Sequence, residues 1–229
     1  MSCAQVAVRE PAAAPVLTLR SRPRRIALVG NANVGKSVLF GRLTGQYAVV
    51  SNYPGTTVSL TKGRMMAGGE VCELIDTPGV TALEGALTED ELVARRILGP
   101  GDTDVVIQVA DARNLRRGLM LTSQLSAIGR PMVLVLNMTD EARVHGIAID
   151  AVGLSARLGI PVVETVATEG RGVAELREAI GRAAVPSFDA AHRGDHALTV
   201  QGTRRRTGDL QRRMPPRPRD DVVADVRVR

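Results

Sequence analysis

The stretch Arg25–Ser37, RIALVGNANVGKS, decides the fold. Its first part, IALV, is apolar throughout, as expected for a strand covered on both faces of a sheet. Residues 30–37 fit the pattern G-x-x-x-x-G-K-[ST], in which a glycine-rich loop joins a strand to a helix and cradles phosphates. At an average glycine usage of about 7%, that pattern arises by chance in roughly 1% of chains of this length. The sequence therefore predicts phosphate binding at this loop.

Each fixed position of the loop has a physical reason. Gly30 and Gly35 let the backbone turn tightly and approach phosphates, while backbone N–H groups and the helix N-terminus provide donors and positive potential. The Lys36 ammonium is expected to reach the β- and γ-phosphates, and the Ser37 hydroxyl is expected to bind Mg2+. We predict nucleotide contacts along the whole loop, from Gly30, Asn31, Ala32, Asn33, Val34, Gly35, Lys36 and Ser37.

Around this loop, short β-branched runs alternate with helical stretches, and glycine, proline or aspartate marks each change. The alternation predicts an α/β fold, a P-loop NTPase with a doubly wound, mostly parallel sheet of six strands and helices on both faces. Strands are predicted at 25–29, 58–65, 70–75, 104–110, 132–136 and 161–166. Helices are predicted from Lys36, from Thr88 with a capping box to Glu91, and over 115–128, 150–158 and 173–184.

A second polar motif, residues 76–79 (DTPG), follows an apolar strand, which is where such sheets bind their ligands. The Asp76 carboxylate can hold a water on Mg2+, and the Gly79 N–H can meet a γ-phosphate. Alone this motif is weak, because an Asp-Pro-Gly turn needs no ligand. After the phosphate loop it predicts the next part of the same site.

A third motif, residues 137–140 (NMTD), ends another apolar strand. The Asp140 carboxylate can accept hydrogen bonds from N1–H and the exocyclic amine of guanine, a pattern that adenine lacks, while Asn137 braces the loops. N-x-x-D by itself also describes an ordinary turn. The three motifs in this order predict GTP and GDP as ligands. The Ala167 N–H is expected to donate to guanine O6. We predict contacts with the base region of the nucleotide from Asn137, Met138, Asp140, Val166 and Ala167.

The segment SNYPGTT, residues 51–57, lies between the first helix and the next predicted strand. One of Thr56 and Thr57 is expected to bind Mg2+ and sense the γ-phosphate, which would make the loop a switch. An ordinary Pro-Gly turn is the alternative. We expect segments 46–58 and 79–90 to become ordered with Mg-GTP and to be released on hydrolysis.

The formal charge of +6 on 229 residues is concentrated at the two ends of the chain. Residues 1–25 carry five arginines against one acidic residue, and residues 181–229 carry eleven against six, which leaves about −3 for the middle. We therefore predict a flexible basic leader over 1–24, a nucleotide-binding domain over 25–184, and an Arg/Pro-rich, reduced or disordered segment over 185–229. No sequence-specific nucleic-acid partner is expected from this distribution.

Composition excludes several other classes of protein. Two cysteines and three scattered histidines cannot make a disulfide framework or a four-ligand zinc site, and they fit a reducing cytoplasmic compartment. The longest apolar runs are far shorter than the roughly 20 residues that a membrane helix needs. An iron site is not expected within the core either.

Beyond the nucleotide motifs, the chain resembles the GTPase domain of the bacterial ferrous-iron transport protein B family, FeoB. The resemblance covers about 26–184 and rests on five segments. These are GNANVGKSVLFGRLTG, SNYPGTTV, IDTPGVTAL followed by TEDELVARRIL, VADARNLRRGLMLTSQL, and LNMTDEARVHGIAIDAVGLSARLGIPVVETVA. Methionine in NMTDEA, where most GTPases carry lysine, is especially typical of that family.

The resemblance implies a mechanism and a setting. It makes Thr57 the switch threonine, and it implies K+ as a cofactor, bound by Asn33 with backbone carbonyls of Ser51 and Tyr53. Since Val80 stands where many GTPases carry a water-positioning glutamine, hydrolysis is expected to be slow and cation-dependent. The expected catalytic residues are Lys36, Asn33, Thr57 and Gly79, and the expected metal ligands are Ser37, Thr57 and Asp76 for Mg2+ (Asp76 through water) with Asn33, Ser51 and Tyr53 for K+.

The resemblance also implies a membrane iron permease as partner, either a continuation of the chain or a separate subunit, at the inner face of the cell membrane. The family's helical domain and membrane pore find no convincing match after residue 184. Two other functions stay open: a ribosome- or RNA-associated GTPase that docks through its basic tails, and a nucleotide-binding regulatory module without useful turnover. The oligomeric state is left open.

Overall fold

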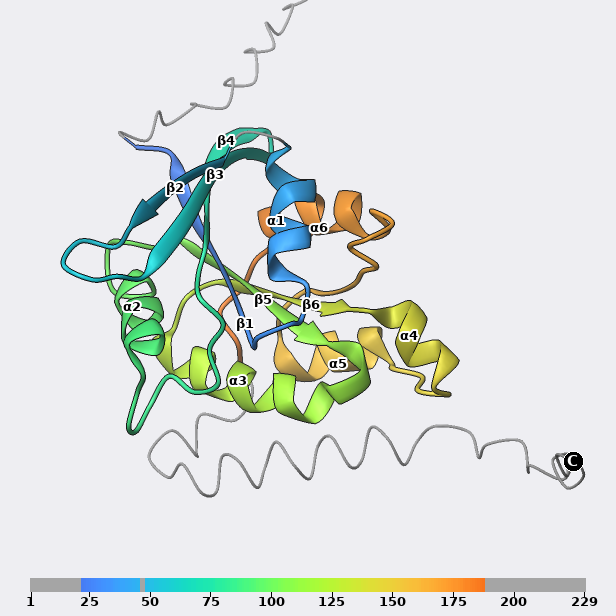
Figure 1. Cartoon of the computed structure of the whole chain (residues 1–229). Helices are drawn as coiled ribbons and strands as arrows, with labels where there is room; N and C mark the ends of the chain where they lie inside the picture. Colours follow the sequence, from blue (N-terminus) through green and yellow to red (C-terminus); the bar gives the residue numbers. More distant parts are fainter. Residues whose placement is uncertain (1–21, 46–47, 188–229) are drawn as a thin grey trace, which may run out of the picture.

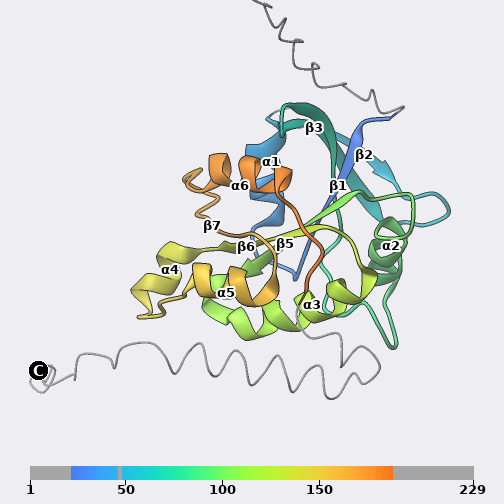
Figure 2. The same cartoon turned by 180° about the vertical axis from the view of Figure 1, so that it is seen from behind.

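A computed structural model of the chain describes residues 22–45 and 48–187 (Figures 1 and 2). Its seven strands are β1 (Arg24–Gly30), β2 (Ala48–Asn52), β3 (Ser59–Ala67), β4 (Glu70–Asp76), β5 (Val105–Asp111), β6 (Met132–Asn137) and β7 (Val162–Glu164). Its helices are α1 (Lys36–Thr44), α2 (Glu89–Ile97), the 3-10 turn η1 (Ala112–Asn114), α3 (Leu115–Ile128), α4 (Thr139–Val144), α5 (Ala151–Leu158) and α6 (Val173–Gly181). The predicted leader and the Arg/Pro-rich segment lie outside the described residues, apart from a few at their inner ends.

The strands form one mixed sheet in the order β2-β3-β4-β1-β5-β6-β7. Neighbours from β4 through β1, β5 and β6 to β7 pair in parallel, whereas β2, β3 and β4 pair antiparallel. This confirms the predicted α/β, P-loop NTPase class with a mostly parallel, doubly wound sheet. The carboxyl ends of β1, β4, β5 and β6 meet at one edge, which positions the loops that follow them.

Side chains of the central strands alternate between two separate hydrophobic clusters. In β1, Ile26 and Leu28 face the layer of α1 and α6, whereas Ala27 and Val29 face the layer of α2, α3 and α5. Strands β5 and β6 follow the same period of two, and Figure 1 shows the helices in these two layers. Burial on both faces explains why these strands read as continuous apolar runs.

The prediction of six strands is wrong by one. Strand β2 was assigned to a switch loop, yet it pairs with β3 from Ala48↔Gly63 to Asn52↔Ser59. All five of its residues are exposed, including Val49 and Val50 at 69% and 67%. A strand that buries no side chain leaves no alternating pattern in the sequence, so only backbone pairing reveals it.

Sequence signals at the ends of helices predicted the structure better than the sequence of β2 did. Thr88 caps α2 with the predicted capping box, since its hydroxyl accepts from the Glu91 N–H and the Glu91 carboxylate accepts from the Thr88 N–H. Helix α5 ends at Gly159, whose φ of 67° lies in the left-handed region that favours glycine. The short helix α4 was not predicted, because six residues directly after a strand read as a turn. In the described ranges, none of the helices is long and apolar enough to cross a membrane.

Candidate functional site

The phosphate loop joins β1 to α1 at the carboxyl edge of the sheet, and its two glycines are required by close contacts. A Cβ on Gly30 would lie 2.3 Å from the Val109 carbonyl oxygen of β5. A Cβ on Gly35, whose φ is 88°, would lie 2.3 Å from Nδ2 of Asn137. The loop is therefore packed directly against β5 and against the side chain that ends β6.

Lys36 lies inside this loop and is 8% exposed. Its Nζ donates to the carbonyl oxygens of Gly30 at 3.3 Å and Asn31 at 3.1 Å. Burial lowers the pKa of Lys36, and the charge of Asp76 opposes that shift. Because carbonyl dipoles only partly offset the cost of a buried cation, the loop is suited to receive an anion at this point.

Ser37 and Asp76 lie together beside the lysine. The Ser37 hydroxyl donates to Oδ2 of Asp76 at 3.1 Å, while Oδ1 is buried without a hydrogen-bond partner in the described part of the chain. Burial raises the pKa of Asp76, against the lowering effects of Lys36 and the Ser37 hydroxyl. A hydroxyl and a carboxylate are hard oxygen donors that suit Mg2+, which takes few protein ligands and fills its shell with phosphate oxygens and water. The residues present therefore fit Mg2+, although the described ranges hold no cluster of three or more His, Cys, Asp or Glu.

The segment after Asp76 is hydrogen-bonded to the phosphate loop. The Val80 N–H donates to the Gly30 carbonyl at 3.1 Å, and the Asn31 amide donates to the Val80 carbonyl at 2.8 Å. A Cβ on Gly79 would meet Cα of Ala32 at 3.0 Å. The Val80 side chain is fully buried, so this position cannot hold a water near a phosphate.

Glu91, the fourth residue of the predicted capping box, does more than cap a helix. Its Oε1 accepts from the N–H groups of Thr81 at 2.9 Å and Ala82 at 3.0 Å, and its Oε2 accepts from the N–H of Thr88 at 3.0 Å and from the Thr88 hydroxyl at 3.1 Å. Hydrogen bonds from the backbone of Thr88 and then Ala82 lower the pKa of Glu91 to about 2. The hydrogen bonds of this one buried carboxylate thus hold the 79–90 segment against α2. The capping motif alone did not predict this role.

Glu91→Gln is expected to destabilise the chain at pH 7 by about 2 to 3 kcal/mol, because the amide NH2 cannot accept the two Oε2 hydrogen bonds. The folded-state pKa of Glu91 is lowered, so the carboxylate stabilises the native state fully above its ordinary pKa of 4.5 and loses that effect as pH falls toward about 2. Denaturant unfolding from pH 7 to 2.5 should therefore show the curves of both proteins converging in acid. Glu89→Gln, on the exposed side of the same turn, is the control, and a constant gap at all pH values would contradict the assignment.

Asn137 connects three loops through its side chain. Its Nδ2 donates to the Val34 carbonyl of the phosphate loop at 3.0 Å. Its Oδ1 accepts from the Thr165 hydroxyl and the Ala167 N–H, each at 3.0 Å. The predicted bracing role is therefore visible as geometry, with Thr165 as a partner that the sequence did not single out.

Asp140 is the second residue of α4, and the helix follows Met138, whose φ of 63° turns the chain sharply after β6. Oδ1 of Asp140 is buried and has no hydrogen-bond partner among the described residues. An unpaired buried carboxylate oxygen is costly unless a ligand supplies donors. The N1–H and exocyclic amine of guanine are donors of that kind. The Ala167 N–H is bound to Asn137, so its contact with guanine O6 stays a prediction that requires this N–H to be shared or released.

The predicted switch and K+ residues do not lie in the arrangement that nucleotide and cation binding would require. Thr57 is exposed, Ser51 belongs to the β2 ladder, and the Tyr53 carbonyl accepts from both the N–H and the hydroxyl of Thr56 at 3.0 Å. Asn33 is exposed with a φ of 62°, a conformation that asparagine tolerates without any ligand. In this conformation the Tyr53 carbonyl already accepts two hydrogen bonds, so the predicted K+ ligands could bind a cation only after this segment rearranges.

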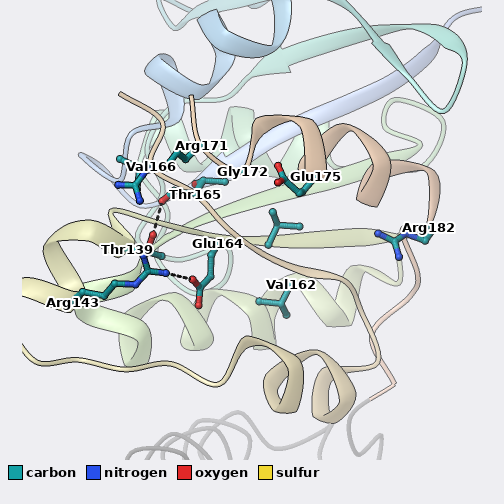
Figure 3. A pocket seen from close by; sticks show the side chains of 11 residues that line it. Thr139, Arg143, Val162, Glu164, Thr165, Val166, Arg171, Gly172, Glu175 and Arg182 are labelled. Carbon is teal, nitrogen blue, oxygen red and sulfur yellow. Dashed lines mark hydrogen bonds and ion pairs between the residues drawn. The ribbon is translucent and has the colours of Figure 1, made fainter. Parts of the chain in front are cut away.

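A pocket of about 420 Å³ is lined by residues of β7, α4, α6 and the loop that follows β7 (Figure 3). Two of its lining residues are joined by hydrogen bonds, since Thr139 donates to the Thr165 carbonyl through its N–H at 3.4 Å and its hydroxyl at 3.2 Å. Arg143 donates to the Glu164 carboxylate at 2.8 Å, an ion pair that Figure 3 draws as a dashed line between two lining residues. This pocket was not predicted.

The fold and these loops define the chain as a P-loop NTPase domain. A family model described as Ferrous iron transport protein B matches residues 24–180. The chain therefore belongs to the FeoB family, and the described part corresponds to that family's G domain.

Individual relatives agree with this assignment. The Fe(2+) transporter FeoB of Escherichia coli K12 is 42% identical over 160 residues, which are 69% of this chain and 21% of the relative. The cytosolic domain of T. maritima FeoB in GDP form I superimposes with a TM-score of 0.68 at 38% identity, covering 73% of this chain and 68% of that one. Its GMPPNP form gives 0.67 at 38% identity, covering 72% and 68%. The chain thus spans about a fifth of the length of the E. coli relative.

Proposed function

We propose that this chain binds GTP and GDP with Mg2+ and hydrolyses GTP slowly to GDP and phosphate, as a switch domain of ferrous-iron transport. The observation that carries the proposal is the Asn137 network, which joins the phosphate loop at Val34 to the loop of Ala167. Next to that network, Asp140 presents an unpaired buried oxygen. The T. maritima relative was solved in GDP and GMPPNP forms, which supports the same ligand class here.

Each residue of the proposed site would have a separate role in binding or hydrolysis. Lys36 would exchange its two carbonyl partners for phosphate oxygens and hold their charge in a buried setting. Ser37 and Asp76 would hold Mg2+, which neutralises charge on the phosphates when bound. Asp140 and the Ala167 loop would read the guanine base. Turnover would be slow because Val80, fully buried under the phosphate loop, offers no group to orient water.

We further propose that K+ stimulates hydrolysis through Asn33 and the backbone carbonyls of Ser51 and Tyr53, after this segment leaves its pairing with β3. GTP turnover is expected to be several-fold faster in KCl than in NaCl at matched ionic strength, with the difference lost in Asn33→Ala. Phosphate release from the purified chain checks this. Equal rates in both salts would refute the K+ proposal, and binding without turnover in either salt would favour the regulatory-module alternative.

In its cellular setting, we propose that residues 25–184 act at the inner face of the cell membrane on a membrane iron permease, which is either a continuation of this chain or a separate subunit. The E. coli relative, an Fe(2+) transporter, supports this setting. An RNA-associated GTPase would instead show nucleic-acid binding that falls steeply with salt and disappears when the basic ends are removed.

A further inference from the structure

Arg42, in the last turn of α1, reaches from the phosphate-loop helix to the base-contacting loop. Its Nε donates to the Ala167 carbonyl at 3.1 Å, and its Nη2 donates to the Thr168 carbonyl. One guanidinium therefore grips two consecutive carbonyls, a geometry that suits the planar fork of arginine. Neither the phosphate-loop pattern nor the guanine motifs singled out this residue.

The loop that Arg42 grips, residues 166–172, is called the base loop below. Most of its remaining hydrogen bonds are internal turns: Glu169 N–H to the Val166 carbonyl at 3.1 Å, Gly170 N–H to the Ala167 carbonyl at 3.3 Å, and Val166 N–H to the Arg171 carbonyl at 3.2 Å. On its outer side the pocket of Figure 3 is lined by Val166, Arg171 and Gly172. The loop thus borders open space there and is held mainly from the side of Arg42 and Asn137.

Helix α6, which follows the base loop, is also hydrogen-bonded to α1. Arg177, on α6 directly after the loop, donates to the carbonyls of Arg42 at 3.1 Å and Leu43 at 2.9 Å at the end of α1. Hydrogen bonds therefore run in a closed circuit: from the phosphate loop to Asn137, on to the base loop, through Arg42 into α1, and back to the phosphate loop. Breaking the Arg42 link would open this circuit without touching any phosphate ligand.

We propose that Arg42 is a positioning residue that holds the base loop beside the proposed guanine site and so sets how long GDP stays bound. The proposal rests on the guanine-nucleotide function argued above. It also explains a cationic side chain at this exposed position, because among the described residues the Arg42 side chain donates only to these two carbonyls.

The test compares Arg42→Ala, Arg42→Lys and the unmodified chain, with Arg64→Ala, an exposed arginine of β3, as the control. Dissociation of a fluorescent GDP analogue is followed after adding excess unlabelled GDP. Arg42→Ala should release it about three- to tenfold faster, as expected for two lost hydrogen bonds. Lysine should restore part of the effect, since one ammonium cannot bridge both carbonyls as a fork does. Alanine is a good helix former, so α1 should persist.

A second readout separates base positioning from general damage. Competition binding gives the preference for GDP over ADP, and that preference should narrow in Arg42→Ala by about the same factor as the dissociation rate rises. Equal weakening of GDP and ADP, or an unchanged GDP dissociation rate, would overturn the role of Arg42. If the unmodified chain binds no GDP at all, the proposed function is wrong, and the inference about Arg42 is then wrong as well.

Discussion

Lys36→Ala is expected to weaken GTP binding by roughly a hundredfold or more, because the ammonium would donate to the β- and γ-phosphates and each charged hydrogen bond contributes about 1.5 to 3 kcal/mol. GDP keeps only the β-phosphate contact, so its binding should weaken by roughly tenfold or more. In the described structure, Lys36 is buried and donates only to two carbonyls of its own loop. Its removal should therefore cost the nucleotide-free fold little, while nearly all of the loss falls on the complex.

Isothermal titration with GDP and Mg2+ measures this loss directly. The sequence contains one other lysine, Lys62 on β3, so Lys62→Ala is a matched control that removes the same charge away from the loop. Thermal unfolding without nucleotide should give similar midpoints for all three proteins. If Lys36→Ala kept its affinity for GDP, the phosphate-loop assignment would be wrong.

The second large effect is expected from Asp140→Asn, which should convert a guanine site into a xanthine site. The carboxylate can accept from both N1–H and the exocyclic amine of guanine, whereas an amide accepts with one atom and donates with the other. Xanthine carries a carbonyl where guanine carries the amine, so it suits the amide. Sites that read bases by buried hydrogen bonds discriminate by roughly 10⁴, and a shift of two or more orders of magnitude in the GDP-to-XDP preference is expected.

Competition between GDP, XDP and ADP for each protein gives that preference. Because the variant should gain affinity for XDP, a loss of folding cannot imitate the result. An unchanged preference for GDP would mean that the unpaired oxygen of Asp140 faces something other than the base.

Much of the fold and of the site could be predicted from the sequence, for physical reasons that particular residues show. Strands β1, β5 and β6 are buried on both faces, so their apolar runs were unmistakable. The candidate site residues at the ends of β1, β4 and β6 were therefore expected to lie at one edge of the sheet. Asn137 was predicted to brace loops, and it does so at Val34 and Ala167.

The features that could not be predicted from the sequence depend on contacts between segments that are distant in the chain. Glu91 read as a helix cap, but its bonds to Thr81 and Ala82 follow from how the 79–90 segment folds back. Arg42 read as one more charged residue of a helix, because its two carbonyl partners lie more than 120 residues away in sequence. Strand β2 was missed since exposed side chains carry no periodic signal.

That last strand has a wider consequence. Strand β2 contributes backbone hydrogen bonds and no buried side chain, so detaching it would cost the sheet one ladder and none of the hydrophobic cohesion that keeps the domain folded. The free energy of rearranging this segment and the free energy of global unfolding are thus set by separate sets of residues. Natural variation within Ala48–Asn52 could therefore change the first of these free energies without changing the second.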